Sequence, residues 1–345
     1  MRIALDATYS VDQHPSGIAI YSRELLSGLA KTFPEDNFLH CYRLKRFKGA
    51  PSPAFRNVKR CVLQPPLTTF RADLFHALNQ RVDRRPAKKV ISTFHDLFVM
   101  TGEYSTPEFR ARFTKQAQRA AQNSDFIITV SEFTANQVSS LLGFERSRIC
   151  VVPHGVHQPV CGAAGQRENI ILFVGALQLR KNIARLVQAF ETLPENWRLV
   201  LAGAPAGYQV ERILGRIEQS PRRDHIQVRG YVSQSELERL YSCASIFAFP
   251  SLDEGFGMPI LEAMAHGLPV ITSRRSAMAE VAGHAAMLID PDQTEELRSA
   301  LNLLVHDPEQ RQHLSEAGRA RARLYTWEQA VQSTHSVYKE LLSGS

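Results

Sequence analysis

Two carboxylates in one apolar segment are the residues of this sequence best suited to chemistry. The segment 249-FPSLDEGFGMPILEAMAHGLPVITS-273 carries Glu254 and Glu262 among residues otherwise fit for burial. A buried carboxylate without hydrogen-bond donors is costly, so each needs a partner. A carboxylate can accept both hydroxyls of a vicinal diol, as the acidic residue of dinucleotide-binding folds does with ribose. The pattern therefore predicts that Glu262 binds a ribose and that Glu254 meets another polyol.

Glycines in the same segment indicate close approach of a ligand to the backbone. Gly255 and Gly257 leave N–H groups near a helix N-terminus, which favours anionic oxygens. Pro259 suits the first turn of that helix, so Glu254 is expected on a loop and Glu262 within the helix. The plainer alternative is that Glu254 caps the helix and Glu262 pairs with a basic side chain.

Two adjacent cations follow another expected strand. The strand 170-IILFVG-175 leads into 176-ALQLRKN-182, which places Arg180 and Lys181 at the carboxyl end of the strand and beside a helix N-terminus. Adjacent cations there fit a diphosphate that must leave without a metal. The sequence shows no DxD-type metal pair in a matching loop. A nucleotide sugar would satisfy the ribose, polyol and diphosphate requirements together.

These residues need a scaffold of parallel strands and helices. Short β-branched or apolar runs alternate with segments of helical period, which is typical of α/β folds with doubly wound parallel sheets. At roughly 150 residues per domain, 345 residues predict two domains. The stretch 157–168 is rich in Gly, Ala and Pro and is the best linker. We therefore expect two Rossmann-like domains, residues 1–160 and 161–325, facing a cleft.

Individual elements can be read from the same periodicities. In the first half helices are expected near 17–31, 107–122 and 132–142. Strands are expected at 2–8, 38–44, 58–64, 73–78, 90–94, 126–131 and 149–153, and in the second half at 169–175, 198–203, 226–232, 246–251, 269–273 and 285–289. Ligands of such open sheets bind beyond the carboxyl ends of the strands.

Charge is unevenly distributed between the two halves. Residues 1–160 hold 22 Lys and Arg against 13 Asp and Glu, whereas residues 161–345 hold 19 against 21. The basic clusters 43–48 and 84–89 could attract lipid phosphate, membrane headgroups or nucleic acid, or could simply form a solvated surface. No signal sequence or membrane-spanning run is evident, which predicts a cytoplasmic protein. Five cysteines without CxxC spacing favour neither a disulfide framework nor a zinc site.

The motifs in this order resemble the retaining glycosyltransferases of family four, which have the two-domain GT-B fold. The resemblance rests on 175-GALQLRKN-182, on 230-GYV-232 and on the E-x7-E spacing from Glu254 to Glu262. It extends through essentially the whole chain, in the blocks 95-HDL-97, 130-VSEFT-134, 151-VVPHGV-156 and 326-TWEQAVQSTHSVYKELL-342. Among family members the chain looks most like bacterial mannosyltransferase-type enzymes of surface polysaccharide assembly.

The resemblance implies roles for individual residues. Glu254 would contact the transferred sugar, Glu262 the ribose, and Arg180 and Lys181 the departing diphosphate, while His95 would line the sugar pocket. The other donor-binding positions that it implies are Gly17, Gly230, Tyr231, Val232, Gly255, Phe256 and Gly257. Residues 326–345 would form a helix that crosses back to the N-terminal, acceptor-binding domain. Many family members have an arginine where Ala176 stands, so diphosphate neutralisation would rest on Arg180 and Lys181.

The implied reaction moves a hexose, with mannose as the first expectation, with retention at the anomeric carbon. The donor would be a GDP- or UDP-linked sugar, with no cofactor and no metal. The acceptor would be a glycan or lipid-linked glycan, with possible peripheral membrane contact through the basic N-terminal domain. A nucleotide-sugar epimerase of the same fold and a non-catalytic nucleotide-sugar-binding protein remain alternatives. A nicotinamide dehydrogenase is disfavoured because the first loop lacks GxGxxG, and a nucleic-acid protein because no recognised module is present.

Overall fold

The computed structural model describes residues 1–345 except 13–15, 64–70, 160–166 and 344–345. The chain forms two compact units. Unit 1 consists of Met1–Glu103, Pro107–Gly155 and Thr326–Ser345, and unit 2 of Tyr104–Thr106 and Val156–Tyr325. The boundary expected between residues 160 and 161 lies outside the described residues, as does most of the expected linker.

Unit 1 is built on a seven-stranded parallel sheet with the order β3-β2-β1-β4-β5-β6-β7. Its strands are β1 Arg2–Asp6, β2 Asn37–Arg43, β3 Val58–Leu63, β4 Leu74–Ala77, β5 Lys89–Phe94, β6 Phe126–Thr129 and β7 Ile149–Val151. Its helices are η1 Thr8–Val11, α1 Gly17–Thr32, α2 Leu44–Phe47, α3 Phe98–Thr101, α4 Pro107–Gln122, α5 Glu132–Leu142, η2 Arg146–Arg148 and α13 Trp327–Ser343.

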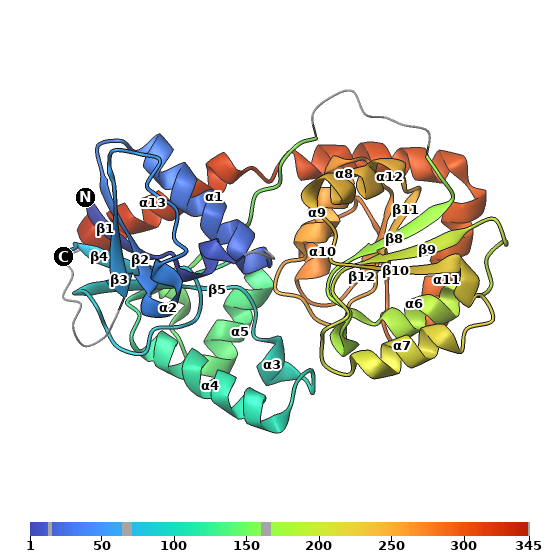
Figure 1. Ribbon diagram of the computed structural model, residues 1–345, viewed down its shortest axis with the longest axis horizontal. Helices are drawn as coiled ribbons and strands as arrows, with labels where there is room; N and C mark the ends of the chain where they lie inside the picture. Colours follow the sequence, from blue (N-terminus) through green and yellow to red (C-terminus); the bar gives the residue numbers. More distant parts are fainter. Residues whose placement is uncertain (13–15, 64–70, 160–166, 344–345) are drawn as a thin grey trace. The chain divides into compact units, whose positions relative to one another are not determined.

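Helices cover both faces of this sheet. Helices α1 and α13 run together along one face, and α4 and α5 lie on the other (Figure 1). Strand β1 presents apolar side chains to both layers of helices. Ile3 and Leu5 pack with α1 and α13, while Ala4 between them belongs to the opposite core. Alternate side chains of a strand point to opposite faces, so a strand covered on both sides must be apolar throughout.

Unit 2 is a second parallel α/β unit, with six strands in the order β10-β9-β8-β11-β12-β13. Its strands are β8 Ile170–Val174, β9 Arg198–Ala202, β10 Ile226–Gly230, β11 Ile246–Phe249, β12 Val270–Ser273 and β13 Met287–Ile289. Its helices are η3 Leu179–Lys181, α6 Ile183–Phe190, α7 Val210–Glu218, η4 Arg223–His225, α8 Gln234–Cys243, α9 Met258–Ala265, α10 Ala277–Ala282, α11 Thr294–His306 and α12 Pro308–Ala322.

The predicted fold class, two doubly wound α/β domains with parallel sheets, is confirmed. In unit 2, helices α6, α7 and α11 cover one face of the sheet and α8, α9 and α12 the other (Figure 1). The strand order reverses direction between β8 and β11, which is where ligands of such sheets bind. Among the described residues, no helix combines the length and the apolar character needed to cross a membrane.

Several expected strands end one or two residues earlier than the sequence suggests, and the end of β10 has a clear cause. The apolar run 226–232 predicts a strand throughout, but β10 ends at Gly230, where the pairing with β9 shifts register. Gly230 has φ +64°, a left-handed conformation that interrupts a strand. Tyr231 and Val232 therefore lie in the turn that leads to α8.

Gly203 joins the carboxyl ends of β8, β9 and β10. Its N–H donates to the carbonyl of Gly230 at 2.8 Å, and a Cβ placed on it would lie 2.0 Å from the carbonyl oxygen of Gly175. Since backbone must move to admit a methyl group there, we expect Gly203→Ala to lower the free energy of unfolding by at least about 2 kcal/mol, measured by urea titration. Gly215→Ala is the control, because that helical site has no atom within 4 Å of an added Cβ. Equal unfolding midpoints for the two variants would contradict the close approach.

Candidate active site

Two turns meet at the carboxyl edge of the sheet in unit 2. The turn after β8 carries Arg180 and Lys181 in η3, and the turn after the neighbouring strand β11 carries Glu254. The N–H of Leu252 donates to the carbonyl of Arg180 at 2.7 Å, and Arg180 Nη1 donates to the carbonyl of Asp253 at 2.7 Å. The backbone of each turn is thus bonded to the other.

Glu254 holds both cations at once. Its Oε2 lies 2.7 Å from Arg180 Nη1, and its Oε1 lies 2.5 Å from Lys181 Nζ. All three residues are buried, and the Lys181 ammonium also lies 4.6 Å from the centre of the Phe249 ring. Two cations on one carboxylate give these three side chains a net charge of +1. They present positive charge where the sequence predicts a diphosphate.

The ion pairs set the charge state of Glu254. Burial alone raises the pKa of its carboxyl, but the charges and hydrogen bonds of Arg180 and Lys181 lower it by more, to about 2. Glu254 is therefore ionised at neutral pH, with both of its oxygens engaged.

This shift predicts how stability depends on pH. The unfolded pKa of Glu is about 4.3, and the folded value is the lower one, so ionised Glu254 stabilises the fold above about pH 4.3. That contribution is lost as the pH falls toward about 2, the folded pKa. We expect the Tm difference between the wild type and Glu254→Gln to be constant near neutrality and to narrow below about pH 4.3 in a calorimetric pH series. A difference for Glu254→Gln that stays constant down to about pH 2 would contradict the assigned pKa.

Asn182, directly after the two cations, fixes their turn. It adopts the left-handed conformation with φ +58°, which Asn tolerates better than most residues. Its Nδ2 donates to the carbonyls of Pro250 at 3.1 Å and Pro291 at 2.7 Å. Because Pro250 begins the loop that carries Glu254, Asn182 positions both halves of the ion-paired cluster.

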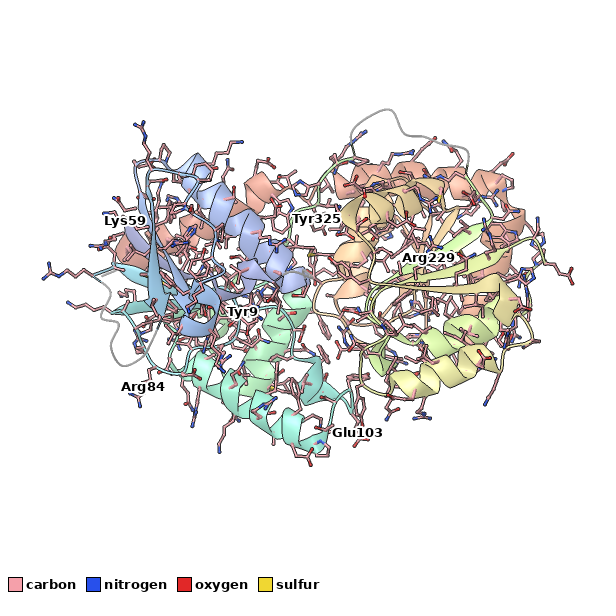
Figure 2. The ribbon with its side chains drawn as sticks, viewed as in Figure 1. Tyr9, Lys59, Arg84, Glu103, Arg229 and Tyr325 are labelled. Carbon is pink, nitrogen blue, oxygen red and sulfur yellow. The ribbon has the colours of Figure 1, made fainter. Side chains whose placement is uncertain are left out.

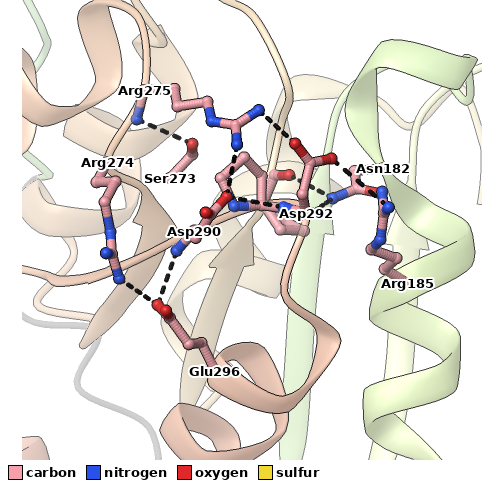
Figure 3. Close-up of polar contacts among 10 residues, drawn as sticks. Asn182, Arg185, Ser273, Arg274, Arg275, Asp290, Asp292 and Glu296 are labelled. Atoms are coloured by element: carbon pink, nitrogen blue, oxygen red, sulfur yellow. Dashed lines mark hydrogen bonds and ion pairs between the residues drawn. The ribbon is translucent and has the colours of Figure 1, made fainter.

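A charged network extends from Asn182 to the loops after β12 and β13 (Figure 3). Arg185 donates to Asn182 Oδ1 at 3.1 Å and lies 3.5 Å from Asp292. Arg275 pairs with Asp292 at 2.5 Å and with Asp290 at 2.8 Å. These contacts hold the loop after β12 against the turn of Asn182.

The loop after β12 in turn holds the backbone of Glu254. The hydroxyl of Ser276 accepts from the N–H of Glu254 at 3.1 Å, and the N–H of Ala277 donates to its carbonyl at 3.2 Å. Ser276 has φ +54° and ψ −154°, a conformation normally restricted to glycine. A strained non-glycine residue bonded to the backbone of Glu254 indicates that the backbone position of Glu254 is tightly determined.

Glu262 lies in α9, as predicted, and its partner is a tyrosine. The hydroxyl of Tyr241, on α8, donates to Glu262 Oε2 at 2.7 Å. Burial raises the pKa of Glu262 above its usual value, although the Tyr241 hydroxyl and His157 act in the opposite direction. No residue within the described ranges donates a hydrogen bond to Oε1 of Glu262. That oxygen keeps its capacity for a ligand hydroxyl.

The glycines beside Glu254 shape the start of α9. Gly257 is the residue before the helix and has φ +96°, where a side chain would be strained. Gly255 lies on the same loop, and Phe256 between them is buried with its ring edge-on to Tyr325, the centroids 6.0 Å apart. The predicted donor-binding role of all three stays a prediction.

The predicted base-binding residues lie at the end of β10. Gly230 has positive φ, Tyr231 is 49% exposed and Val232 is partly exposed. The N–H of Gly203 fixes the carbonyl of Gly230, which places this turn at the same carboxyl edge as Arg180.

The remaining two predicted residues belong to unit 1. Gly17 is the first residue of α1, after Ser16, whose hydroxyl accepts from the N–H of Ala19. His95 follows β5, is buried, and bonds through Nε2 to the carbonyl of Leu78 at 2.9 Å. Burial lowers the pKa of His95 to about 4, so its ring is neutral at neutral pH.

His95 is one of several buried rings in unit 1. Its ring centroid lies 4.8 Å from that of Tyr21 and 5.4 Å from that of His154. Tyr21 bonds to Thr93, which also contacts His76 Nε2, and His76 Nδ1 lies 2.6 Å from the hydroxyl of Tyr338 on α13. These contacts fix His95 from both β5 and the C-terminal helix.

Across the described ranges, no group of three or more His, Cys, Asp or Glu side chains is arranged to hold a metal ion. The cysteines within those ranges are free thiols: Cys41, Cys61, Cys150 and Cys243.

Two family models match the chain. Residues 162–321 match the family described as "Glycosyl transferases group 1", and residues 16–158 match "Glycosyltransferase Family 4". A sucrose-phosphate synthase from Thermosynechococcus elongatus has a TM-score of 0.81 at 22% identity, over 100% of both chains. Anabaena HepE in complex with UDP and glucose has a TM-score of 0.74 at 16% identity, over 98% of this chain and 99% of that chain. Two parallel α/β units of this topology form the GT-B fold, and both family models that match the chain describe glycosyltransferases.

The chain belongs to glycosyltransferase family 4. It is 29% identical over 292 residues to "O-antigen chain mannosyltransferase B" of Escherichia coli, covering 80% of this chain and 76% of that protein. It is also 29% identical over 243 residues to "MMP alpha-(1->4)-mannosyltransferase" of Mycolicibacterium hassiacum, covering 67% of this chain and 58% of the relative's length.

Proposed function

We propose that this glycosyltransferase moves a hexose, with mannose as the first candidate, from a nucleotide sugar to a glycan or lipid-linked acceptor in surface polysaccharide synthesis, with retention at the anomeric carbon. The observation that carries the proposal is the buried cluster in which Glu254 orients Arg180 and Lys181. The names of the two mannosyltransferases to which the chain is similar support mannose.

Different groups at the carboxyl edge of unit 2 bind different parts of the donor. Arg180 and Lys181 bind the diphosphate, whose charge develops further as the glycosidic bond breaks. Glu262 accepts the ribose hydroxyls through the oxygen that Tyr241 does not occupy. The turn at Gly230 contacts the base of GDP or UDP through its backbone.

The reaction breaks the bond between the anomeric carbon and the diphosphate oxygen and forms one between that carbon and the acceptor oxygen. The acceptor hydroxyl attacks from the same face from which the diphosphate departs, and its proton passes to the departing diphosphate oxygen. The transfer changes no oxidation state and needs no further reactant. The cations stabilise the negative charge on the leaving group, and the hexose keeps its anomeric configuration.

Attack from the same face fits the state of the two carboxylates. A double displacement needs a carboxylate nucleophile beneath the sugar ring. Both oxygens of Glu254 are engaged by cations, and its pKa of about 2 makes it a weak nucleophile. Glu262 is tied to Tyr241. Glu254 therefore acts on the diphosphate indirectly, by holding Arg180 and Lys181 in place. Any contact that Glu254 makes with the sugar is made while both cations hold its carboxylate.

We also propose that no metal or cofactor takes part, because Arg180 and Lys181 supply the positive charge that a metal would provide. The acceptor is recognised by unit 1, whose exposed basic residues would favour an anionic or membrane-bound substrate. Figure 2 shows Lys59 and Arg84 on the surface of that unit.

The first experiment is a thermal-shift screen with GDP, UDP and ADP and their sugar conjugates, in EDTA and then with Mg²⁺. A ligand at 100 times its Kd adds about 2.7 kcal/mol of stability. We expect one nucleotide to shift Tm, and to do so equally with and without metal. A shift that requires Mg²⁺ would remove the metal-independent mechanism, and no shift with any nucleotide would remove the transferase assignment of this site. Conversion of the matching nucleotide sugar to its epimer, without any acceptor, would instead indicate an epimerase.

A further inference from the structure

Unit 1 contains a pocket of about 450 Å³ at the carboxyl end of β4. Asn79, Gln80 and Arg81, directly after that strand, form one wall. The first three turns of α4 supply Phe109, Arg112, Phe113 and Gln116, at helical spacing, on the opposite wall. Tyr9, on η1, also lines it.

The wall after β4 carries buried polar atoms that lack partners. Asn79 is 4% exposed and Gln80 is 7% exposed. Nδ2 and Oδ1 of Asn79 and Oε1 of Gln80 make no hydrogen bond with any residue that the structure describes. Buried polar groups are nearly always bonded, so unmet groups beside a pocket indicate a ligand that bonds them. A hydroxyl both donates and accepts, which matches an amide whose donor and acceptor are both unmet.

The opposite wall is aromatic. Phe109 and Phe113 lie one helical turn apart, with ring centroids 6.3 Å apart and planes inclined by 26°. Such a surface can bury the apolar C–H face of a sugar ring while amides bond its hydroxyls. Aromatic and amide walls together favour a hexose over a flat apolar ligand.

The charge of the pocket favours an anion. Arg81 and Arg112 line it, and no Asp or Glu does so among the described residues. Asp83 approaches Arg81 Nε only at 3.9 Å and is half exposed, so it screens this guanidinium weakly. The first turn of α1 also lines the pocket, through Ile18, and a helix N-terminus attracts negative charge. Two guanidinium groups are suited to the oxygens of a phosphate group.

We propose that this pocket binds a phosphorylated sugar ring and is the site for the glycan end of the acceptor. The sugar lies between the amides of Asn79 and Gln80 and the ring of Phe113, and its phosphate meets Arg81 and Arg112. The role as acceptor site rests on the proposed transferase function. The binding of a sugar phosphate does not, because it follows from unit 1 alone.

The test uses the full-length protein and mannose 6-phosphate, titrated by calorimetry. We expect Arg112→Ala and Asn79→Ala each to weaken its Kd by about tenfold or more. Arg119→Ala is the matched control, since it removes the same charge from the exposed last turn of the same helix. Arg180→Ala in unit 2 should also leave the Kd unchanged, because the proposed donor site is a separate one. Arg112 is exposed, so its variant is expected to fold like the wild type.

Two further probes separate the parts of the ligand. Methyl α-mannoside and inorganic phosphate should each bind at least about tenfold more weakly than mannose 6-phosphate. Equal binding of inorganic phosphate would reduce the pocket to a simple anion site, and equal binding of the mannoside would remove the phosphate from the proposal. Loss of binding in Arg180→Ala but not in Arg112→Ala would move the ligand to unit 2 and overturn it. Binding that persists in a protein stabilised by no nucleotide would keep the pocket but remove its acceptor role.

Discussion

At saturating donor, Arg180→Ala is expected to lower kcat by about 10²- to 10³-fold, the range found when one preorganised donor to developing negative charge is removed. Arg180 is suited to this role because its guanidinium is held by Glu254 and by the carbonyl of Asp253 before any ligand binds. Lys181→Ala should have an effect of similar size. Since both cations share Glu254, we expect the fold-decrease in kcat of the double variant to be smaller than the product of the two single fold-decreases. Initial rates of nucleotide release measure all three.

The matched control is Arg212→Ala, on the exposed side of α7, where the guanidinium bonds only to Gln209 among the described residues. It should retain the kcat of the wild type. Burial makes Arg180→Ala prone to instability, so circular dichroism must show that the variant is folded at the assay temperature. A folded Arg180→Ala protein with unchanged kcat would falsify the role of Arg180 at the diphosphate.

The second large effect concerns nucleotide affinity. We expect Glu262→Gln to weaken the Kd of the preferred nucleoside diphosphate by about tenfold to 100-fold, because a charge-assisted hydrogen bond is replaced by a neutral one. A 2′-deoxy nucleotide should bind the wild type more weakly than the normal nucleotide by a similar factor. For Glu262→Gln, the two nucleotides should have nearly equal Kd values. That non-additivity would assign the lost contact to the ribose, and isothermal titration of the four combinations measures it.

Glu238→Gln on the exposed face of α8 makes the same chemical change away from the site and should leave every Kd as it is. If the deoxy nucleotide loses its full factor in Glu262→Gln as well, Glu262 acts on another part of the nucleotide or only through Tyr241. The ribose assignment would then be wrong.

The sequence predicts where these groups lie better than what they contact. Strand and helix periodicity place Arg180, Lys181 and Glu254 at the carboxyl edge of one sheet, because parallel strands end together there. The pairing itself joins residues 73 positions apart, and no local rule reports it. The alternative interpretation is wrong for Glu254. Glu254 takes the basic partners and caps no helix, since α9 begins after Gly257 without a side-chain cap.

Several contributors carry no signal that sequence reasoning could use. Tyr241 lies on an ordinary amphipathic helix 21 residues before Glu262, and only the packing of α8 beside α9 brings its hydroxyl to the carboxylate. Ser276 is unremarkable in type, and its importance lies in its backbone conformation. Asn182 could have been found, because an asparagine directly after a helical turn often adopts the left-handed conformation that it has here.

The place of α13 has a consequence for how the chain folds during synthesis. Trp327, Val331 and Tyr338 of α13 belong to the core of unit 1, whose members outside this helix all come from the first 152 residues. Unit 2 needs almost no residue outside Val156–Tyr325 and can fold as soon as it leaves the ribosome. At about 5 to 20 residues per second, the nascent unit 1 waits about 10 to 40 s with one face of its sheet incompletely covered. The unit made first is thus completed last, and until then its apolar face is a target for chaperones.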